Sequence, residues 1–363
     1  MTVRAPEAGP PVRQASGQRR KVVRLWDGRV SARIGRRATV VAVCLLALAA
    51  AALVAALLVG SYPISFGAVF RALAGNGTRQ QLYFVNDVRL PRVLVALLVG
   101  AALAVAGAIF QSLTGNPLGS PDIIGFNGGA AAGALVVMLV LDDGSLLSSG
   151  IGAVLGGAVV AVLVYVLAYR DGVQGYRLVL VGVGVSALLS AGIAYLLSRA
   201  ELTDSMNAQV WMVGSLNGRD WEQVWTLVAV LAVALPAAFA LNRRLVALEL
   251  GEEAATALGL SVRRTRQSAI AVSVVLSAVA VATAGPITFV ALAAPQIAKR
   301  LARSAGPSLV TSALTGACLL ALADLAAQTV IPRTQLPVGV ATVVLGGLYL
   351  GWLLAGEARR GRA

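Results

Sequence analysis

The stretch of sequence that decides the fold begins with Arg89-Leu90-Pro91-Arg92, continues through a long apolar run, and ends in Asn116-Pro117-Leu118-Gly119-Ser120-Pro121. The apolar run is long enough to cross a bilayer as a helix, which takes about 20 residues. A polar segment broken by Pro and Gly therefore adjoins a membrane-spanning segment. Irregular backbone at membrane depth survives only where it is buried in protein or lines a water-filled path. This combination indicates a transport pathway rather than an anchor.

The composition points to the same class of protein. Of the 363 residues, 58% are hydrophobic and only 13% are charged, against roughly 25% charged residues in globular domains. The apolar surplus is too large for a soluble core, so we expect an all-α, polytopic membrane protein. At about 30–35 residues for a span and its loop, the length predicts ten transmembrane helices. They are expected at residues 38–60, 92–111, 123–141, 148–169, 176–198, 223–241, 266–285, 287–302, 309–330 and 337–356.

The basic residues are unevenly distributed along the chain, and their distribution predicts its orientation in the membrane. Residues 1–38 hold ten of the 30 basic residues and show little periodicity, so we expect a disordered basic cytoplasmic tail. Residues 39–356 form the ten-helix membrane domain, and residues 357–363 a cytoplasmic C-terminal tail. With the N-terminus inside, 23 basic residues fall on the cytoplasmic side and seven on the outer side. The positive-inside rule therefore predicts that both termini are cytoplasmic.

A faint internal repeat is also present. Ala106-Gly107 precedes Pro117, and Ala284-Gly285 precedes Pro295, with the same ten-residue spacing from Gly to Pro. The first pair closes an inward-running span and the second an outward-running one, which is the relation of inverted repeats in transporters. Coincidence in a chain rich in Ala and Gly is the alternative.

Several kinds of chemistry are excluded by what the sequence lacks. It has no His, and Cys44 and Cys318 both fall inside predicted spans, so neither a metal site nor a hydrolytic centre is expected. No P-loop motif occurs, and the only lysines are Lys21 and Lys299, so the chain binds no ATP itself. The aromatic platforms and sustained basic face of nucleic-acid-binding proteins are missing as well.

Polar residues in the predicted membrane region are the candidate pathway residues. Gln111, Asn116, Pro117 and Asn127 surround the break between two spans. They either line a path for substrate or satisfy backbone groups that the prolines release. Asp324 is the one acidic residue well inside a span, where a carboxylate needs a partner. We expect Asp324 to have a structural hydrogen-bonding role.

The longest internal loop contains a short predicted helix. Gly251 ends the preceding turn, Glu252 and Glu253 favour the N-terminus of a helix through its dipole, and Gly259 closes it. A short surface helix in a cytoplasmic loop suits docking to a cytoplasmic partner, although an ordinary loop helix is the simpler interpretation.

The order of these motifs resembles the FecCD-type permeases, the membrane subunits of ABC importers for iron-siderophore complexes, heme and cobalamin. The resemblance runs from about residue 40 to 356, and Ser120 to Asn127 is most similar to the ferric-enterobactin branch. The matching residues are Arg89-Leu-Pro-Arg92, Gly100-Ala-Ala-Leu103, Gly107, Gln111, Asn116-Pro-Leu118, Pro121, Gly125, Gly129-Ala130, Trp211-Met-Val-Gly-Ser215, Leu250-Gly-Glu-Glu253, Leu258-Gly259, Gly285-Pro-Ile-Thr-Phe-Val290, Pro295 and Leu336-Pro-Val-Gly339.

The resemblance implies partners and roles. It implies a second permease subunit, identical or homologous, two cytoplasmic ATPase subunits that use ATP, and an extracytoplasmic siderophore-binding protein. Arg89 and Arg92 fall where the family presents arginines to the binding protein, and two outward arginines suit charge-steered docking. Snorkelling to lipid headgroups is the alternative. The ATPase coupling loop is expected at Gly251, Glu252, Glu253, Ala255, Leu258 and Gly259.

This chain departs from the family pattern at three positions. Gln296 stands where His is common, Gln328 where Arg is common, and Leu348 where Pro is usual. The Gln328 change removes one docking arginine, and Arg333, five residues later, is its candidate replacement.

The combined interpretation is a multi-pass permease subunit of the cytoplasmic (inner) membrane that is not an enzyme. It is expected to translocate a ferric siderophore of the catecholate, enterobactin-like kind, with a cobalamin or heme permease as the alternative. A proton-coupled transporter would show several intramembrane carboxylates, and a membrane enzyme would show a cluster of reactive side chains. The sequence shows neither.

Overall fold

The computed structural model describes residues 20–25, 30–60, 62–122, 125–141, 145–169, 175–304, 306–330 and 336–360. The first elements are two strands, β1 (Arg20–Leu25) and β2 (Val30–Gly35), paired antiparallel with Arg20 opposite Gly35. This hairpin lies within the segment for which the sequence predicted a disordered tail, and it leads directly into the first helix. Residues 1–19 lie outside the described part of the chain.

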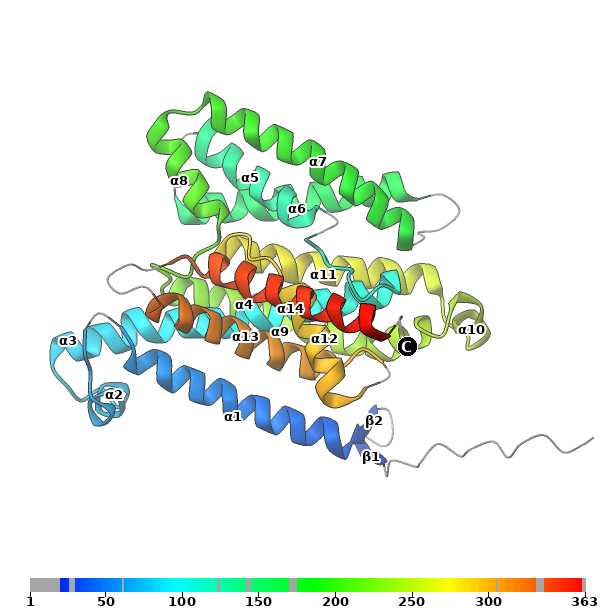
Figure 1. Ribbon diagram of the computed structural model, residues 1–363, viewed down its shortest axis with the longest axis horizontal. Coiled ribbons are helices and arrows are strands. Elements are labelled where there is room, and N and C mark those ends of the chain that lie inside the picture. The colour runs from blue at the N-terminus through cyan, green and yellow to red at the C-terminus, as the bar shows by residue number, and fades with distance from the viewer. Residues whose placement is uncertain are drawn as a thin grey trace, which may run out of the picture.

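All other described elements are helices (Figure 1). In chain order they are α1 (Arg36–Leu58), α2 (Phe66–Leu73), α3 (Arg79–Leu82), the π-helix η1 (Tyr83–Arg89), α4 (Leu90–Thr114), α5 (Phe126–Val140), α6 (Leu146–Ala168), α7 (Gly175–Arg199), α8 (Leu202–Met212), α9 (Trp221–Leu248), α10 (Glu252–Ala257), α11 (Val262–Ala284), α12 (Val290–Ala302), α13 (Leu309–Thr329) and α14 (Val338–Arg360).

Each predicted span corresponds to one of these helices. Seven helical segments are long and apolar enough to cross a membrane by length and composition, among the residues described, and α3, η1 and α4 form one of them, Arg79–Thr114. Two further helices, α5 and α14 up to Trp352, are apolar but shorter. The structure therefore supports a polytopic helical membrane protein. The total of ten crossings, the inverted repeat and the orientation of the termini stay predictions.

Helix boundaries follow the Gly and Pro residues of the sequence. Gly115 adopts a φ of 61° and ends α4, and Gly285 adopts a φ of 74° directly after α11. The left-handed region favours Gly because other residues have a Cβ that clashes there. The Gly285-Pro286 step is therefore a turn between two helices and not a kink within one.

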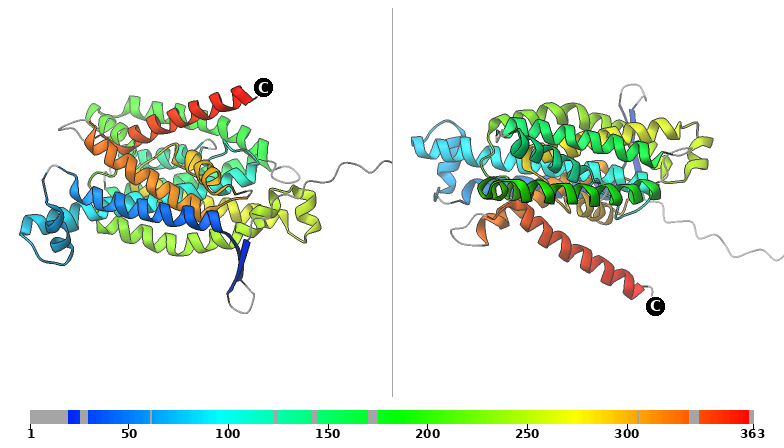
Figure 2. Two further views of the ribbon diagram at one scale, coloured as in Figure 1. Left: turned by 60° about the horizontal axis from the view of Figure 1, so that its bottom comes forward. Right: turned by 90° about the horizontal axis from the view of Figure 1, so that it is seen from above.

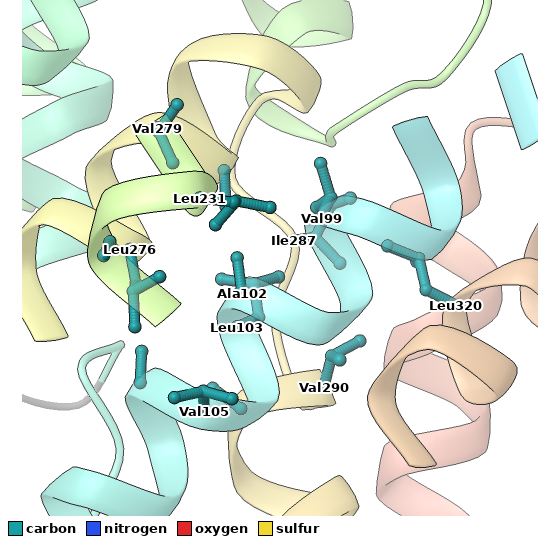
Figure 3. Close-up of a cluster of buried hydrophobic side chains, with 14 of the residues drawn as sticks. Val99, Ala102, Leu103, Val105, Leu231, Leu276, Val279, Ile287, Val290 and Leu320 are labelled. Carbon is teal, nitrogen blue, oxygen red and sulfur yellow. The ribbon is translucent and has the colours of Figure 1, made fainter. Parts of the chain in front are cut away.

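The core lies around α4, which is buried along most of its length. Figure 3 shows its Val99, Leu103 and Val105 surrounded by apolar side chains from α9, α11, α12 and α13, with Ile287 from the turn before α12. Helices α5, α6, α7 and α8 lie together on one side of this centre, and α1 lies against α13 at the opposite edge (Figure 1). Figure 2 shows that α14 runs along the edge of the bundle with its C-terminal end pointing away.

Candidate functional site

Arg89 is buried at the end of the π-helix η1. Its side chain is 7% exposed, and its guanidinium donates to the carbonyl oxygens of Leu57 (2.7 Å), Leu58 (3.3 Å) and Tyr62. These are groups at and just beyond the C-terminus of α1, where helical carbonyls lack partners and the dipole favours a cation. Arg89 therefore caps α1 from inside the protein, whereas the resemblance implied an outward arginine.

Arg92 forms a two-pronged ion pair with Asp324 of α13. Its Nη2 lies 2.8 Å from Oδ1 and its Nε 3.0 Å from Oδ2, and the two side chains are 12% and 3% exposed. Gln328 donates a further hydrogen bond to Asp324 Oδ2 at 2.8 Å. The intramembrane acid thus has the partner that its position requires. Gln328, where the family commonly has Arg, supports the carboxylate from its own helix.

Docking of a binding protein to Arg89, Arg92 or Arg333 stays a prediction. The contacts above show that Arg89 and Arg92 fix α4 to α1 and α13. Arg333 lies outside the described residues.

Of the candidate pathway residues, Asn116 and Pro117 lie in the turn after α4, and Asn127 lies at the start of α5. Asn116 and Pro117 are exposed, and Asn116 accepts hydrogen bonds from the backbone of Leu118 and Gly119, which is a local turn. Asn127 is buried at the start of α5 and donates to Asp122 Oδ1 at 2.5 Å, and it accepts a longer bond from Ser277 of α11 at 3.5 Å. Asn116 and Pro117 shape the turn. Asn127 links the start of α5 to Asp122 before it and to Ser277 of α11.

Asp122 connects this segment to the turn before α12. The backbone N–H of Phe289, a residue with a left-handed φ of 68°, lies near enough to the Asp122 carboxylate to favour its charged form. Desolvation of the carboxylate raises the pKa of Asp122 to about 7, against the opposing effect of the Phe289 N–H. The two helix breaks noted in the sequence, one before α5 and one before α12, therefore meet at one carboxyl group.

Gln111 joins α4 to α12. It is 4% exposed, donates to the carbonyl of Leu292 at 3.0 Å, and accepts a bond of 2.7 Å from Gln296. The Gln296 residue that departs from the family pattern is therefore one partner in a buried contact between these helices. Both amide groups satisfy each other and the backbone, which is what buried polar groups require.

Helix α10 forms where the sequence predicted a short helix. Gly251 and Gly259 flank it with φ values of 105° and 78°, and Ala255 is its buried residue. Glu252 pairs with Arg266 of α11 at 2.6 Å, while Glu253 is exposed. Leu250 and Leu258 on either side are 67% and 66% exposed. Exposed apolar side chains beside a weakly attached helix are suited to contact with another protein.

Sequence reasoning missed three residues next to this helix. Glu249, immediately after α9, accepts hydrogen bonds on Oε1 from Ser112 of α4 (2.9 Å) and Lys299 of α12 (3.1 Å). In the sequence, Lys299 was notable only as one of the two lysines, and Ser112 had no distinguishing feature. No local signal distinguished them, because their partners are far away in the chain.

Comparison with known proteins places this architecture in a family. The model of the FecCD transport family matches residues 46–356. The chain belongs to the FecCD transport family. As a FecCD protein it is a membrane transport permease and not an enzyme, and ATP hydrolysis in these importers occurs in separate ATPase subunits. FecCD permeases work with those subunits and with a substrate-binding protein.

Relatives of this FecCD chain serve different cargoes. It is 46% identical to the ferric enterobactin transport system permease protein FepG of Escherichia coli over 301 residues, 83% of this chain and 91% of that protein. It is 35% identical to the Fe(3+)-citrate import permease YfmE of Bacillus subtilis, covering 77% and 84%, and 35% identical to the vitamin B12 import permease BtuC of Shigella boydii, covering 87% and 95%.

A solved structure shares the FecCD fold. An inward-facing metal-chelate type ABC transporter superimposes with a TM-score of 0.77 at 28% identity, over 88% of this chain and 99% of that chain.

Proposed function

We propose that this chain is the permease subunit of an ATP-driven importer that carries a ferric siderophore, of the catecholate, enterobactin-like kind, across the cytoplasmic membrane. The 46% identity to the ferric enterobactin permease carries this proposal. Relatives named for hydroxamate, hemin and vitamin B12 are 35%, 32% and 35% identical. Because cargo preference depends on the residues lining the path, the higher identity favours a shared cargo class.

A preassembled iron complex is a cargo that needs no metal ligands from the permease. Among the residues that the structure describes, no cluster of acidic and sulfur side chains is arranged to hold a metal ion. A siderophore holds the iron by itself, so the permease needs only to let the complex pass. The buried polar groups of α4, Gln111 and Ser112, are hydrogen-bonded to protein.

The partners follow from the proposed role. A second permease subunit, identical or homologous, completes the path; two ATPase subunits bind at α10, where Leu250 and Leu258 are exposed. The binding protein docks at the opposite end, at the outer ends of α1, α4 and α13 near Arg89 and Arg92, with Arg333 as a further candidate contact. Both termini are then cytoplasmic, as the distribution of basic residues favours.

The test is uptake of radiolabelled ferric enterobactin by cells that lack only this chain. Ferric hydroxamate and labelled cobalamin serve as parallel cargoes, and restoration by the intact gene is the control. We expect loss of ferric-catecholate uptake alone. Normal uptake of all iron complexes with lost cobalamin uptake would assign the alternative cargo and contradict the proposal.

A further inference from the structure

Three helices meet at the carboxylate of Glu249. The residue directly follows α9, and its Oε1 accepts bonds from Ser112 in the last turn of α4 and from Lys299 in the last turn of α12. The Lys299 and Glu249 side chains are 25% and 20% exposed, so this junction is largely shielded from solvent. One carboxylate oxygen thus fixes the ends of two core helices to the end of a third.

Helices α4 and α12 also contact each other directly, at the residue before Ser112. Gln111, the neighbour of Ser112, is hydrogen-bonded to Gln296 and to the carbonyl of Leu292 on α12. Gln296 lies nearly one turn before Lys299, so the contacts occupy successive turns of the same helix face. A displacement of Glu249 therefore acts on α4 and α12 as one unit.

On its other side, Glu249 adjoins α10. Backbone bonds from Glu249, Leu250 and Gly251 to carbonyls of the last turn of α9 hold this corner. Gly251 then turns the chain at a φ of 105° into α10, whose attachments are the buried Ala255 and the Glu252–Arg266 pair. Figure 1 shows α10 at one end of the molecule, apart from the central helices. Two routes therefore lead from α10 into the bundle, one through the Glu252–Arg266 pair to α11 and one through the corner at Glu249.

We propose that Glu249 is the positioning residue that transmits movement of α10 to α4 and α12, through Lys299 and Ser112. This inference rests on the proposed function, in which ATPase subunits bind α10. The Lys299 and Glu249 side chains keep 25% and 20% of their surface accessible, so the partner that remains when the other is removed can be hydrated. Loss of the pair should therefore affect the coupling between ATP turnover and transport far more than it affects folding.

The test compares Glu249→Ala, Glu249→Gln and the exchanged pair Glu249→Lys with Lys299→Glu. Each variant is purified with its partner permease and ATPase subunits and reconstituted with the binding protein in liposomes. In Glu249→Ala we expect about a tenfold drop in transported cargo per ATP hydrolysed, which lies within the usual range of coupling between sites. Basal ATPase activity and melting temperature should stay as in the unmodified complex, and the exchanged pair should recover most of the transport.

Helix α9 also supplies the control variant. Glu222→Ala removes an exposed acidic residue at the opposite end of α9 and should leave the ratio unchanged. An unchanged ratio in Glu249→Ala, a parallel loss of transport, ATPase activity and melting temperature, or failure of the exchanged pair would each overturn the inference.

A second measurement needs no cargo. Spin labels at Leu118 after α4 and Leu188 of α7, both exposed, report the distance between α4 and a helix outside the Glu249 junction, in a background with Cys44→Ala and Cys318→Ala. ATP should change this distance in the unmodified complex and not in Glu249→Ala. An equal change in both would overturn the inference. If the unmodified complex moves with ATP but does not carry ferric siderophores, only the proposed cargo fails.

Discussion

The buried side chains of Arg89, Arg92 and Asp324 contact other helices and not solvent. Arg89 neutralises the end of α1, and Arg92 neutralises Asp324. An unpaired charge in a low-dielectric interior is costly, so both arginines stabilise contacts between segments. The sequence predicted that both arginines face outward and dock a binding protein. In the structure, their N–H groups donate to acceptors of this chain.

The Arg92–Asp324 pair gives a prediction about stability. Arg92→Met leaves Asp324 buried without its cation and should lower the free energy of unfolding by about 3–5 kcal/mol. The double variant Arg92→Met with Asp324→Leu should recover most of this loss, because it removes both charges. Unfolding in detergent, followed by tryptophan fluorescence, measures the effect, with the exposed Arg71→Met as the control. A double variant as unstable as the single one would contradict the prediction.

Asp122 gives a prediction about pH. Its pKa is raised to about 7 in the folded protein from an ordinary value of 3.8. A raised carboxyl pKa contributes stability that is complete below pH 4 and is lost as the pH rises to 7. The melting temperature of the unmodified protein should therefore fall relative to Asp122→Asn across this window, and the difference should level off above it.

The control for this pH series is Asp204→Asn, which changes an exposed aspartate of α8. Its melting temperature should follow that of the unmodified protein. A difference between Asp122→Asn and the unmodified protein that is constant from pH 4 to 8 would show that Asp122 does not titrate in this window.

At the scale of elements, small residues determine how closely the helices approach. A Cβ on Gly100 of α4 would overlap the carbonyl of Gly316 on α13, and the reverse substitution would overlap Gly100. A Cβ on Gly107 would overlap the carbonyl of Ala291 at the start of α12. Close backbone approach is the usual packing mode in lipid, where hydrophobicity adds no force between helices.

Gly107→Ala tests this packing. The added methyl group forces α4 and α12 apart, and overpacking of this kind costs about 1–3 kcal/mol of folding free energy. Gly184→Ala in α7 is the matched control, because nothing lies within 4 Å of a Cβ built there. The control should be neutral or stabilising by roughly 0.5–1 kcal/mol, since Ala favours a helix over Gly. Equal melting temperatures for the two variants would refute the packing argument.

At the scale of the whole molecule, apolar side chains cover much of the outer surface. Leu180 and Leu188 of α7 and Val159 of α6 are 70%, 71% and 66% exposed. Soluble proteins rarely expose such contiguous apolar surface, whereas a lipid-facing helix requires it. The arrangement leaves α4 enclosed at the centre and the connections α7–α8 and α9–α11 at the ends (Figure 1).

The charge distribution predicts which end is cytoplasmic. Leu258 beside α10 and Leu202 at the start of α8 are exposed and mark the two ends. In a background without Cys44 and Cys318, Leu202→Cys should react with a membrane-impermeant maleimide in cells with a permeabilised outer envelope, and Leu258→Cys only after the inner membrane is opened. Labelling of Leu258→Cys from outside would show that α10 lies on the outer side and would contradict the predicted topology.

The sequence alone determined the apolar helices, the break at Asn116 and Pro117, and the short helix between Gly251 and Gly259, whereas it left the Gly285-Pro286 step open between a kink and a turn. These features are local, because hydrophobicity, Pro and Gly act within a few residues of the backbone. It also determined the family, because the motifs occur in order along the chain.

Only the tertiary structure decided what the polar residues do. Arg92 meets Asp324 across 232 positions of sequence, Gln111 meets Gln296 across 185, and Ser112 meets Glu249 across 137. No local pattern encodes such pairs, since a buried polar group accepts any partner that the packing brings within reach. The folding of α4 between α9, α12 and α13 selected these partners, because each buried donor needs an acceptor in the same dry interior.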